Sequence, residues 1–469
     1  MQELSQQRIV SHRDTEIAEK KHEIINGLSV FSVSLCEIHR CIPNIHTNGF
    51  SYLAQSNDSL KKMKQILFIA FFIMLLSNLS AQLNDDPLYK QAVTLAHKYI
   101  ILDGHVDLPY RLQTKNFRLE REFLDIPIET DKGDFDYKRA KEGGLDAPFM
   151  SVFIPSSYQE EENGGAKKLA DELIDMINGI IAAHPDKFAS AFSPDDIERN
   201  FQQGLISLPM GMENGAPLLS LSDIRYFYKR GIRYVTLTHG KNNHICDSSY
   251  DTTRTWNGLS PYGREVVAEM NDLGMMIDVS HVSDETFYQV IELSIAPVIA
   301  SHSSCRDFTP GWERNMDDDM ILALGKNGGV IQINFGSSFL DEKIRHSYDV
   351  HRDSLNALLK SKGLNESDEA AKPFIDEYRK ANPNLFADVE TVADHIGHVL
   401  AIAGIDHVGL GSDFDGVGDS LPTGLKDVSD YPNLIYVLLK RGYSEEDIAK
   451  ICYGNVFRVW RAVEELKSK

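Results

Sequence analysis

The stretch that decides the fold is Tyr99-Ile100-Ile101-Leu102-Asp103-Gly104-His105-Val106-Asp107. It starts as an apolar, β-branched run typical of a buried strand and ends in side chains that can bind a metal ion or move a proton. Further strand-like runs follow along the chain, at 205–208, 234–237, 275–279, 297–300, 330–333 and 407–410. Amphipathic, helix-like segments such as 166–184 and 262–273 lie between them.

Strands that alternate with helices predict a parallel sheet with helical crossovers. The length from residue 82 to residue 469 suits a (β/α)8 TIM-like barrel with insertions, and we favour this α/β fold over an open doubly wound sheet. The polar, charged segment 340–384 carries no strand-like run. We therefore predict a helical insertion there, over the barrel mouth or at an oligomer contact. No linker rich in proline or glycine divides 82–469, which indicates a single domain.

Composition and charge narrow the class of protein. The chain has 469 residues, 42% of them hydrophobic and 25% charged, as in soluble globular proteins. It has 48 Lys and Arg residues against 69 Asp and Glu, and the net charge of -21 argues against a nucleic-acid-binding protein. The five cysteines form no Cys-x-x-Cys pair, so neither a zinc ribbon nor a disulfide scaffold is indicated. A metal site would therefore use histidines and carboxylates.

A targeting signal is predicted near the N-terminus. The basic group Lys61-Lys62-Met63-Lys64 precedes an unbroken apolar run at 66–76, and small or polar residues follow up to Ala81. This order is typical of a secretory signal peptide, which we place at 63–81, with cleavage after Ala81. Residues 1–62 would then be an over-called N-terminal extension, with Met63 as the true start.

The apolar run is too short for a membrane span, because at about 1.5 Å per residue it covers only part of a ~30 Å hydrocarbon core. No cysteine directly follows the predicted cut, and the sequence ends in charged residues, which argues against a lipid or hydrophobic anchor. We therefore expect an exported protein, periplasmic or secreted, with no stable membrane anchor.

Residues that can carry out chemistry follow the strand-like runs. In a (β/α)8 barrel the carboxyl ends of the strands converge on one mouth, so these side chains are expected to meet in space. They are His105, Asp107, Glu213, His239, His281, His302 and Asp413.

Five of these side chains predict a site for two metal ions. His105 and Asp107 are two residues apart on an extended segment, so they point the same way and can bind one cation through nitrogen and oxygen. Alone, this pair would equally fit a capping aspartate beside a core histidine. The two oxygens of Glu213 could bridge two cations about 3.5–4 Å apart, with His281 and His302 on the second. These ligands suit Zn2+, with Mn2+ or Co2+ left open.

Several motifs, in this order along the chain, resemble those of the membrane (renal) dipeptidase family of zinc peptidases. They are Asp-Gly-His-Val-Asp-Leu-Pro-Tyr at 103–110, Gly-Met-Glu-Asn-Gly at 211–215, Leu-Thr-His at 237–239, Asp-Val-Ser-His-Val-Ser at 278–283, Ser-His-Ser-Ser at 301–304, Arg314-Asn315 and Gly-Ser-Asp-Phe-Asp-Gly at 411–416. The resemblance runs from about residue 99 to residue 460.

The resemblance implies an amidohydrolase-like barrel with two zinc ions that hydrolyses dipeptides through a metal-bridging hydroxide, often with a D-residue at the C-terminal position. By motif position, His105 and Asp107 resemble the ligands of one zinc ion and His281 and His302 those of the other. Glu213 resembles the bridge between them. The resemblance is also compatible with a homodimer.

Three further roles come with the resemblance. His239 resembles the group that stabilises the oxyanion, Arg314 the clamp for the free carboxylate of the substrate, and Asp413 the proton shuttle to the leaving amine. Each role is physically reasonable: a guanidinium grips a carboxylate with two hydrogen bonds, and a positioned donor stabilises charge that develops during the reaction. Taken alone, His239 would also fit a core histidine and Arg314 a surface charge. Asp415 is expected to be a turn or capping residue.

Two other classes of function compete with this one. Other dinuclear amidohydrolases, such as lactonases, deaminases and phosphotriesterase-like enzymes, commonly open with His-x-His and bridge their metals with a modified lysine, unlike His105-Val106-Asp107 and Glu213. A non-catalytic exported binding protein would need neither the full ligand set nor Asp413. The sequence leaves open the physiological dipeptide, the preference for L- or D-residues, action on β-lactam-like amides, and the pairing of the cysteines after residue 82.

Overall fold

The computed structural model describes residues 85–114, 128–130, 132–160, 164–366 and 368–467. The predicted signal peptide and the extension before it lie outside the described residues. The described residues belong to one compact unit, residues 81–469. Among them, no helix combines the length and the apolar character needed to cross a membrane.

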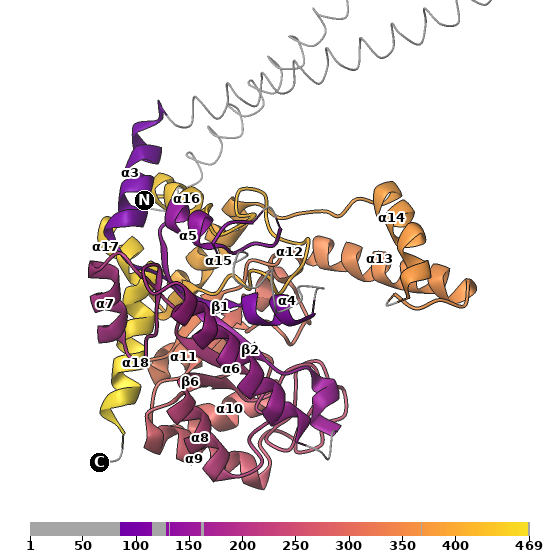
Figure 1. Ribbon diagram of the computed structural model, residues 1–469, viewed down its shortest axis with the longest axis horizontal. Helices are drawn as coiled ribbons and strands as arrows, with labels where there is room; N and C mark the ends of the chain where they lie inside the picture. Colours follow the sequence, from indigo (N-terminus) through magenta and orange to yellow (C-terminus); the bar gives the residue numbers. More distant parts are fainter. Residues whose placement is uncertain (1–84, 115–127, 131, 161–163, 367, 468–469) are drawn as a thin grey trace, which may run out of the picture. The chain divides into compact units, whose positions relative to one another are not determined.

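Eight parallel strands form the central sheet (Figure 1). In order around the sheet they are β1 (Ile101–Val106), β2 (Leu145–Phe153), β5 (Met210–Glu213), β6 (Ile232–Thr236), β7 (Met276–Asp278), β8 (Ile299–Ser303), β9 (Val330–Ile333) and β10 (Val408–Leu410). A parallel bridge between Val106 and Phe414 joins the two ends of the sheet. At this seam the Asp107 amide donates to the Phe414 carbonyl (2.8 Å) and the Asp413 amide to the His105 carbonyl (3.1 Å). The predicted (β/α)8 barrel is confirmed.

Helices alternate with the strands around the barrel (Figure 1). They are α3 (Pro87–Lys98), α4 (Leu108–Thr114), α5 (Tyr137–Gly143), α6 (Gly165–Ala183), α7 (Pro194–Gln202), α8 (Leu221–Arg230), α9 (Pro261–Leu273), α10 (Asp284–Leu293), α11 (Asp318–Asn327), α12 (Ser337–Leu340), α13 (Glu342–Ser361), α14 (Lys372–Ala381), α15 (Val389–Ile402), α16 (Tyr431–Lys440), α17 (Glu445–Ala449) and α18 (Asn455–Glu465). The helices predicted at 166–184 and 262–273 correspond to α6 and α9.

Local capping signals set the helix boundaries. α9 begins after Ser260, whose hydroxyl accepts a hydrogen bond from the Gly263 amide, and its first residue is a proline, which needs no amide partner there. It ends at Gly274, whose positive φ of 72° is favourable for glycine. The chain then turns directly into β7, so that the polar residues after β7 reach the same mouth as those after the other strands.

One predicted strand forms but lies outside the barrel. The apolar run at 205–208 does not join the barrel, because Ile206–Ser207 forms β4 and pairs with β3 (Phe188–Ala189) in a separate two-stranded sheet. The barrel strand is β5, which starts after Pro209. Gly211 interrupts the apolar pattern of β5, but the Tyr234 ring needs that space, since an added Cβ would lie 1.9 Å from it.

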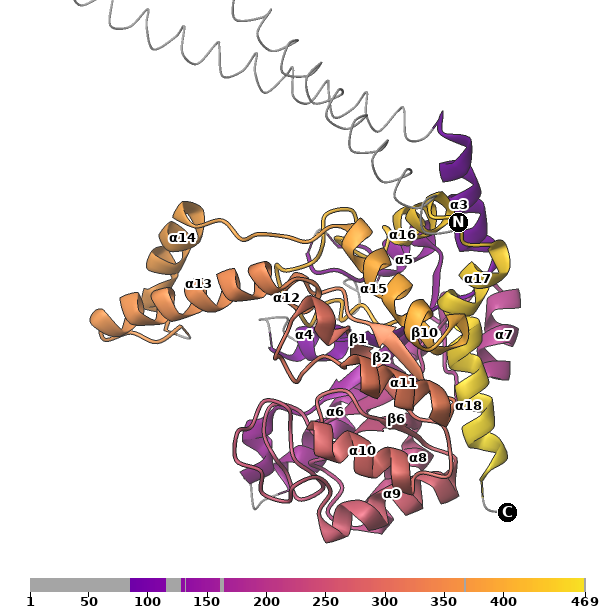
Figure 2. The same ribbon diagram turned by 180° about the vertical axis from the view of Figure 1, so that it is seen from behind.

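The insertion predicted at 340–384 is helical and contains α13 and α14. Both helices extend away from the barrel in the two opposite views (Figures 1 and 2). Their outer parts share a small apolar cluster of Leu355, Leu359, Ala371 and Ile375, separate from the main core. The start of α13 stays at the barrel mouth, where it lines a cavity.

Aromatic rings fill the barrel below the site. Trp460 of α18 packs against Phe149, with 5.2 Å between ring centroids, and Phe149 packs against Tyr234 at 5.1 Å. These buried rings belong to a cluster that includes residues near the amino ends of several strands, such as Ile100 and Val330. The hydroxyl of Tyr234 reaches the other way, towards His105.

Candidate metal centre

The predicted site residues lie at the carboxyl ends of the barrel strands. His105 is in β1, His302 is in β8, and Glu213 is the last residue of β5. The others follow their strands directly or within a few residues: Asp107 after β1, His239 after β6, His281 after β7 and Asp413 after β10. All are buried except His239, which is half-buried. The barrel thus brings together residues that are far apart in the sequence.

Glu213 lies at the centre of this cluster. Its Oε2 is 3.3 Å from Nε2 of His105, whereas its Oε1 is 3.1 Å from Nε2 of His281 and 3.3 Å from Nε2 of His302. Nε2 of His239 is 3.7 Å from the same Oε1. Oδ2 of Asp107 lies 3.5 Å from Nε2 of His105. The two oxygens of Glu213 therefore face different histidines.

Three groups of described side chains could hold a metal ion, each with ligand atoms within 4.8 Å of one another. They are His105 with Glu213 and His302, Glu213 with His239 and His281, and His105 with Asp107 and Asp413. The cluster is therefore a histidine and carboxylate metal site in which two of the groups share Glu213.

The state of His105 fits a cation site. Its Nε2 and the Oδ1 of Asp107 are buried and have no hydrogen-bond partner among the described residues. Burial lowers the pKa of His105, but Tyr234, Glu213 and Asp107 raise it more, so the pKa lies well above its usual value. A ring in contact with two carboxylates thus retains a positive charge, and a metal ion can replace its proton there.

A hydrogen bond behind the ring orients His105. The Tyr234 hydroxyl donates its single proton to the Gly104 carbonyl (3.0 Å), so it must accept from Nδ1 of His105 (2.9 Å). Protonation at Nδ1 makes Nε2 the ligand atom of the neutral ring, and Nε2 is the atom that faces Glu213.

A second relay orients His302. Ser301 Oγ donates to Oδ2 of Asp278 (2.6 Å) and therefore accepts from Nδ1 of His302 (2.7 Å). Asp278 is fully buried, and its Oδ1 accepts from the amides of Ser280 (3.0 Å) and Ser301 (2.8 Å). This carboxylate fixes the serine and, through it, the ring of His302.

The ring nitrogens of His281 and His302 converge. Their Nε2 atoms are 2.8 Å apart, and Nε2 of His281 also accepts from Nη2 of Arg314 (2.9 Å). Burial, with His105 and Arg314 adding to it, lowers the pKa of His302 to about 3, and burial and Arg314 hold that of His281 well below its usual value. Both rings are neutral, so each Nε2 carries a lone pair, and in this structure that of His281 receives the Arg314 donor. Such a pair is suited to a cation.

The pKa values of two carboxyl groups of the site, Asp413 and Glu213, are shifted in opposite directions. Burial raises the pKa of Asp413 to about 7, where Asp107 and Glu213 add to the increase and His105 opposes it. Burial also acts to raise the pKa of Glu213, but His105 and His239 hold it well below its usual value. Glu213 is therefore a permanent anion, whereas Asp413 can exchange a proton near neutral pH.

The backbone is strained at this mouth. Asn214, which follows Glu213, has a φ of 79°, His281 of 69° and Asp413 of 62°. Residues other than glycine adopt this left-handed region at a cost of about 1–3 kcal/mol, and they do so mainly where function requires it. At His281 and Asp413 this conformation directs the side chain into the mouth, whereas the side-chain amide of Asn214 donates to the Ile154 carbonyl.

Arg314 is next to the cluster but does not line the cavity above it. It is only 2% exposed. Its Nη1 donates to Ser303 Oγ and its Nη2 to the His302 carbonyl, both at 2.8 Å, and its buried Nε has no partner among the described residues. The structure brings the predicted clamp to the site, in contact with His281.

A cavity of about 500 Å³ opens over the cluster. Asp107, Glu213, His239, His281 and Asp413 line its inner part. Its walls include residues that sequence reasoning missed: Phe153, Tyr250 and Trp312 from loops and a strand end, Phe339 from α12, and Arg345 and Arg352 from α13. No local pattern marks these residues, because they come together only in the folded chain.

Asp415 has the structural role expected from the sequence, although it also lines the cavity. Its Oδ1 accepts from the Asp134 amide (2.7 Å) and lies 3.2 Å from Nη1 of Arg111. Asp415 thus ties the loop after β10 to the segment before α5.

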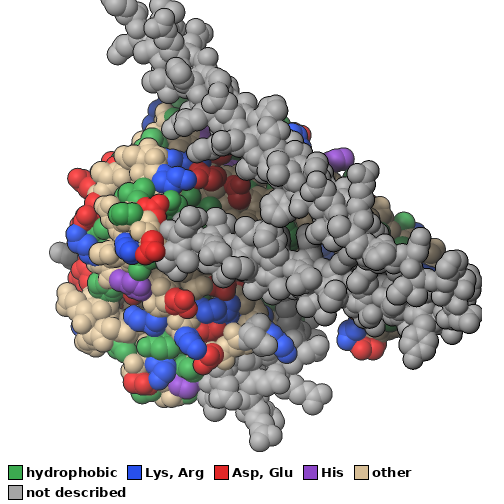
Figure 3. All heavy atoms as spheres, turned by 90° about the horizontal axis from the view of Figure 1, so that it is seen from above, with side chains coloured by type: hydrophobic (Ala, Val, Ile, Leu, Met, Phe, Trp, Pro, Cys, Tyr) green, Lys and Arg blue, Asp and Glu red, His purple; other side chains and the backbone are tan. Residues whose placement is uncertain are grey.

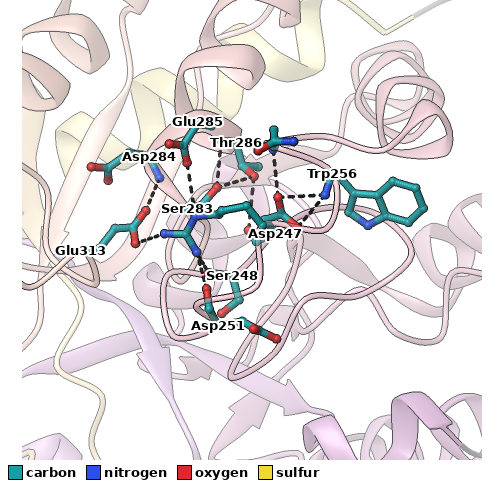
Figure 4. Close-up of polar contacts among 12 residues, drawn as sticks. Asp247, Ser248, Asp251, Trp256, Ser283, Asp284, Glu285, Thr286 and Glu313 are labelled. Carbon is teal, nitrogen blue, oxygen red and sulfur yellow. Dashed lines mark hydrogen bonds and ion pairs between the residues drawn. The ribbon is translucent and has the colours of Figure 1, made fainter.

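Polar contacts anchor the long loop after β6, residues 237–260 (Figure 4). The buried Asp247 accepts from the amides of Trp256 and Gly258, each at 3.1 Å. Arg254 bonds the carbonyls of Ser248 and Asp251 and reaches across to Glu313, the neighbour of Arg314 in the sequence. These contacts hold Tyr250 of this loop at the cavity, 5.8 Å from His281 between ring centroids.

A closed parallel barrel with histidines and carboxylates at its mouth defines a metal-dependent hydrolase of the amidohydrolase-like type. The family model of the membrane dipeptidases (peptidase family M19) matches residues 89–469. The chain belongs to this family and is a metallo-dipeptidase.

Known relatives span most of the chain. Dipeptidase 3 of Mus musculus is 33% identical over 392 residues, which cover 82% of this chain and 69% of the relative. Dipeptidase tcpJ of Claviceps purpurea is 33% identical over 401 residues, which cover 84% of this chain and 83% of the relative.

Solved structures share the fold. The probable dipeptidase PvdM from Pseudomonas aeruginosa has a TM-score of 0.68 and 27% identity, covering 81% of this chain and 99% of that one. A metallopeptidase from Rhodobacter sphaeroides, solved with a phosphinate mimic of the dipeptide L-Ala-D-Ala, has a TM-score of 0.63 and 23% identity, covering 78% of this chain and 99% of that one.

Proposed function

We propose that this enzyme hydrolyses dipeptides with two Zn2+ ions in the cluster. In this proposal His105 and Asp107 would hold one ion and His281 and His302 the other, and Glu213 would be shared between them. The position of Glu213 carries the proposal, because its Oε2 faces His105 and its Oε1 faces His281 and His302. Imidazole and carboxylate ligands in this combination suit Zn2+.

Bound divalent cations polarise a carbonyl group and lower the pKa of water, which is the chemistry that peptide hydrolysis requires at neutral pH. The side chains of the protein supply the other steps. Burial lowers the pKa of His239, so this ring is neutral and can donate to the carbonyl oxygen as negative charge develops there. Asp413, with a pKa of about 7, takes a proton from the attacking water and delivers it to the leaving amine.

Arg314 is proposed to hold the free carboxylate of the substrate. Its contact with Nε2 of His281 (2.9 Å) puts it beside the reacting centre, and the carboxylate of a dipeptide is separated from the scissile nitrogen by a single carbon. A clamp at this distance selects dipeptides over longer peptides. A C-terminal D-residue carries its carboxylate on the same carbon, so we extend the proposal to such substrates.

Metal content per chain, measured alongside kcat/KM on a peptide panel, tests the proposal. We expect two zinc ions per chain and hydrolysis of dipeptides with a C-terminal L- or D-residue. Tripeptides and C-terminally amidated dipeptides should react far more slowly. Equal rates on amidated dipeptides would exclude the Arg314 clamp, and a fully active preparation without metal would refute the mechanism.

We also propose that the protein is exported and processed after Ala81. The basic group at 61–64, the apolar run at 66–76 and the small or polar residues up to Ala81 support this. N-terminal sequencing of the protein recovered outside the cytoplasm of its native host should begin at Gln82. A mature protein that still contains residues before Met63 would contradict both the cleavage and the start.

A further inference from the structure

The insertion gives the substrate cavity a basic wall. Arg345, Tyr348, Asp349 and Arg352 of α13 line the cavity. Both arginines share Asp349, whose carboxylate is 3.2 Å from Nη1 of Arg345 and 2.9 Å from Nη2 of Arg352. Arg352 also approaches Asp353 (3.5 Å), which does not line the cavity. Of the charged side chains that α13 turns to the cavity, two are positive and one is negative.

The guanidinium of Arg345 is only partly engaged by Asp349. Asp349 engages its Nη1, whereas its Nε is buried and has no hydrogen-bond partner among the described residues. The side chain is 25% exposed, so the guanidinium is held in the wall but can be reached from the cavity. A guanidinium binds a carboxylate through its N–H donors, and the exposed part of the Arg345 guanidinium is open to such an anion.

Arg345 lies farther out than Arg314, with aromatic rings between them. The Arg314 guanidinium is 5.2 Å from the Phe339 ring centroid, Phe339 is 5.0 Å from Trp312, and Trp312 is 5.6 Å from the Arg345 guanidinium. A main-chain carboxylate held at Arg314 cannot also reach Arg345 across two rings. Arg345 is therefore free for a second carboxylate, such as one at the end of a substrate side chain.

The charge of this α13 wall differs in sign from the net charge of the whole protein. The whole chain has a net charge of -21, which repels an acidic substrate at long range. On the face shown in Figure 3, Lys and Arg side chains are interspersed with Asp and Glu. The α13 wall, with two arginines against one aspartate, therefore favours an acidic group, whereas the inner part of the cavity is lined by the carboxylates of Asp107, Glu213 and Asp413.

We propose that Arg345 is a specificity-determining residue that makes the enzyme prefer dipeptides with Asp or Glu at the C-terminal position. This inference rests on the proposed dipeptidase function and names its substrate class. The Arg345 guanidinium binds the side-chain carboxylate, the aromatic pair Trp312 and Phe339 packs against the intervening methylenes, and Arg314 holds the main-chain carboxylate.

The test compares kcat/KM of the zinc-loaded, full-length enzyme on Ala-Glu and Ala-Gln, which differ in charge but hardly in size. We expect the wild type to prefer Ala-Glu by about tenfold or more, as one charge-assisted hydrogen-bond pair provides. Arg345→Met should remove this preference by slowing Ala-Glu and leave Ala-Gln within about twofold, and Arg345→Lys should retain part of it. Unchanged activity on Ala-Gln also shows that the variant is folded.

Arg379→Met is the matched control. Arg379 is on α14 of the same insertion, 66% exposed, and lies outside this cavity, so its loss removes one positive charge without touching the wall. We expect the Ala-Glu to Ala-Gln ratio to stay at the wild-type value. A ratio that falls as far as in Arg345→Met would mean that the overall charge of the insertion, not Arg345, sets the preference.

Other outcomes would overturn the inference. Equal wild-type rates on Ala-Glu and Ala-Gln would do so, as would a preference found only for Glu-Ala over Gln-Ala, which places the acid on the other residue. If Arg345→Met instead abolished discrimination between free and amidated C-termini, Arg345 would be the main-chain clamp. Failure of the zinc-loaded enzyme to hydrolyse any dipeptide would refute the proposed function itself, whereas all the other outcomes leave that function standing.

Discussion

At the scale of single residues, the site depends on side chains that touch no substrate. His105 is presented by Tyr234, and His302 by Ser301 and Asp278, through hydrogen bonds that leave Nε2 of each ring as the ligand atom. Such partners behind a ligand commonly contribute a factor of ~10–100 to metal affinity. The metal affinity of the site can therefore be lowered by changing these partners, without altering the histidines themselves.

The first prediction concerns Tyr234. Tyr234→Phe keeps the buried ring in its aromatic cluster but removes the acceptor of Nδ1 of His105 and the donor to the Gly104 carbonyl. We expect zinc affinity to fall by ~10–100-fold, measured by competition with a chromophoric chelator. Tyr436→Phe, which removes a hydroxyl bonded to Asp86 far from the site in the fold, should leave affinity unchanged. Wild-type affinity in Tyr234→Phe would show that the relay does not matter.

The second prediction concerns Glu213. Glu213→Gln removes the charge that faces the three histidines His105, His281 and His302 and makes one of the two shared oxygens a poorer ligand. We expect less than two zinc ions per chain, and a fall in kcat/KM of at least about 100-fold, because metal-ion catalysis supplies several kcal/mol. Elemental analysis and dipeptide hydrolysis test this. Retention of two tightly held ions would contradict the bridging role.

At the scale of elements, the sequence predicted those strands whose apolar runs are uninterrupted, such as β6, β7 and β9. It missed β2, where Asp146 and Pro148 break the pattern, although Asp146 accepts a hydrogen bond from the Ile101 amide of the neighbouring strand (3.3 Å). The metal-site candidates could be predicted because they lie at the carboxyl ends of strands or within a few residues after them. Tyr250 and Arg345 could not, since their place at the cavity depends on how a long loop and an insertion fold.

The third prediction concerns α13 and α14. Leu359 is 1% exposed in a cluster that contains only residues of the insertion, so it stabilises these helices and not the barrel. Leu359→Ala should cost the insertion about 2–5 kcal/mol. We expect hydrogen exchange to accelerate in 342–381 and to stay unchanged in the barrel strands, as measured by mass spectrometry. Faster exchange in β1 or β5 would show that the insertion and the barrel unfold together.

The fourth prediction concerns His395 of α15. Its Nδ1 accepts from the Cys305 amide and its Nε2 donates to the Leu340 carbonyl, both at 3.1 Å. Burial lowers its pKa from 6.5 to about 4. Between these values the unfolded chain binds a proton that the folded chain does not, so stability is full above pH 6.5 and is lost as the pH falls towards 4.

Protonation of His395 therefore lowers the free energy of unfolding by about 2 kcal/mol between pH 7 and pH 5. Urea unfolding of the wild type and of His395→Gln at both pH values measures it. We expect the wild type to lose about 2 kcal/mol more than the variant on acidification. Equal losses in the two proteins would mean that His395 is protonated as readily in the folded protein as in the unfolded chain.

At the scale of the whole molecule, the metal cluster joins parts of the barrel that are far apart in the sequence. Its proposed ligands come from β1, β5 and β8 and from the segments after β1 and β7, and the seam that closes the barrel runs through His105, Asp107 and Asp413. An ion shared by Glu213 and a histidine therefore links strands that are not neighbours in the barrel. Without ions, like groups repel one another across this mouth and oppose its closure. They are the lone pairs of His281 and His302 and the carboxylates of Asp107, Glu213 and Asp413.

The fifth prediction follows from this arrangement. Ions that bind the folded chain and not the unfolded one stabilise it by about 4 kcal/mol per site when free zinc is ~1,000 times the dissociation constant. Treatment with 1,10-phenanthroline should therefore lower the midpoint of thermal unfolding by several degrees, and added zinc should restore it. Glu213→Gln, with its bridge impaired, should show a smaller difference between the two states. If the chelated wild type, shown to be free of metal, melted at the same temperature as the zinc-loaded enzyme, the ions would not hold the barrel mouth together, and the cluster would matter for chemistry alone.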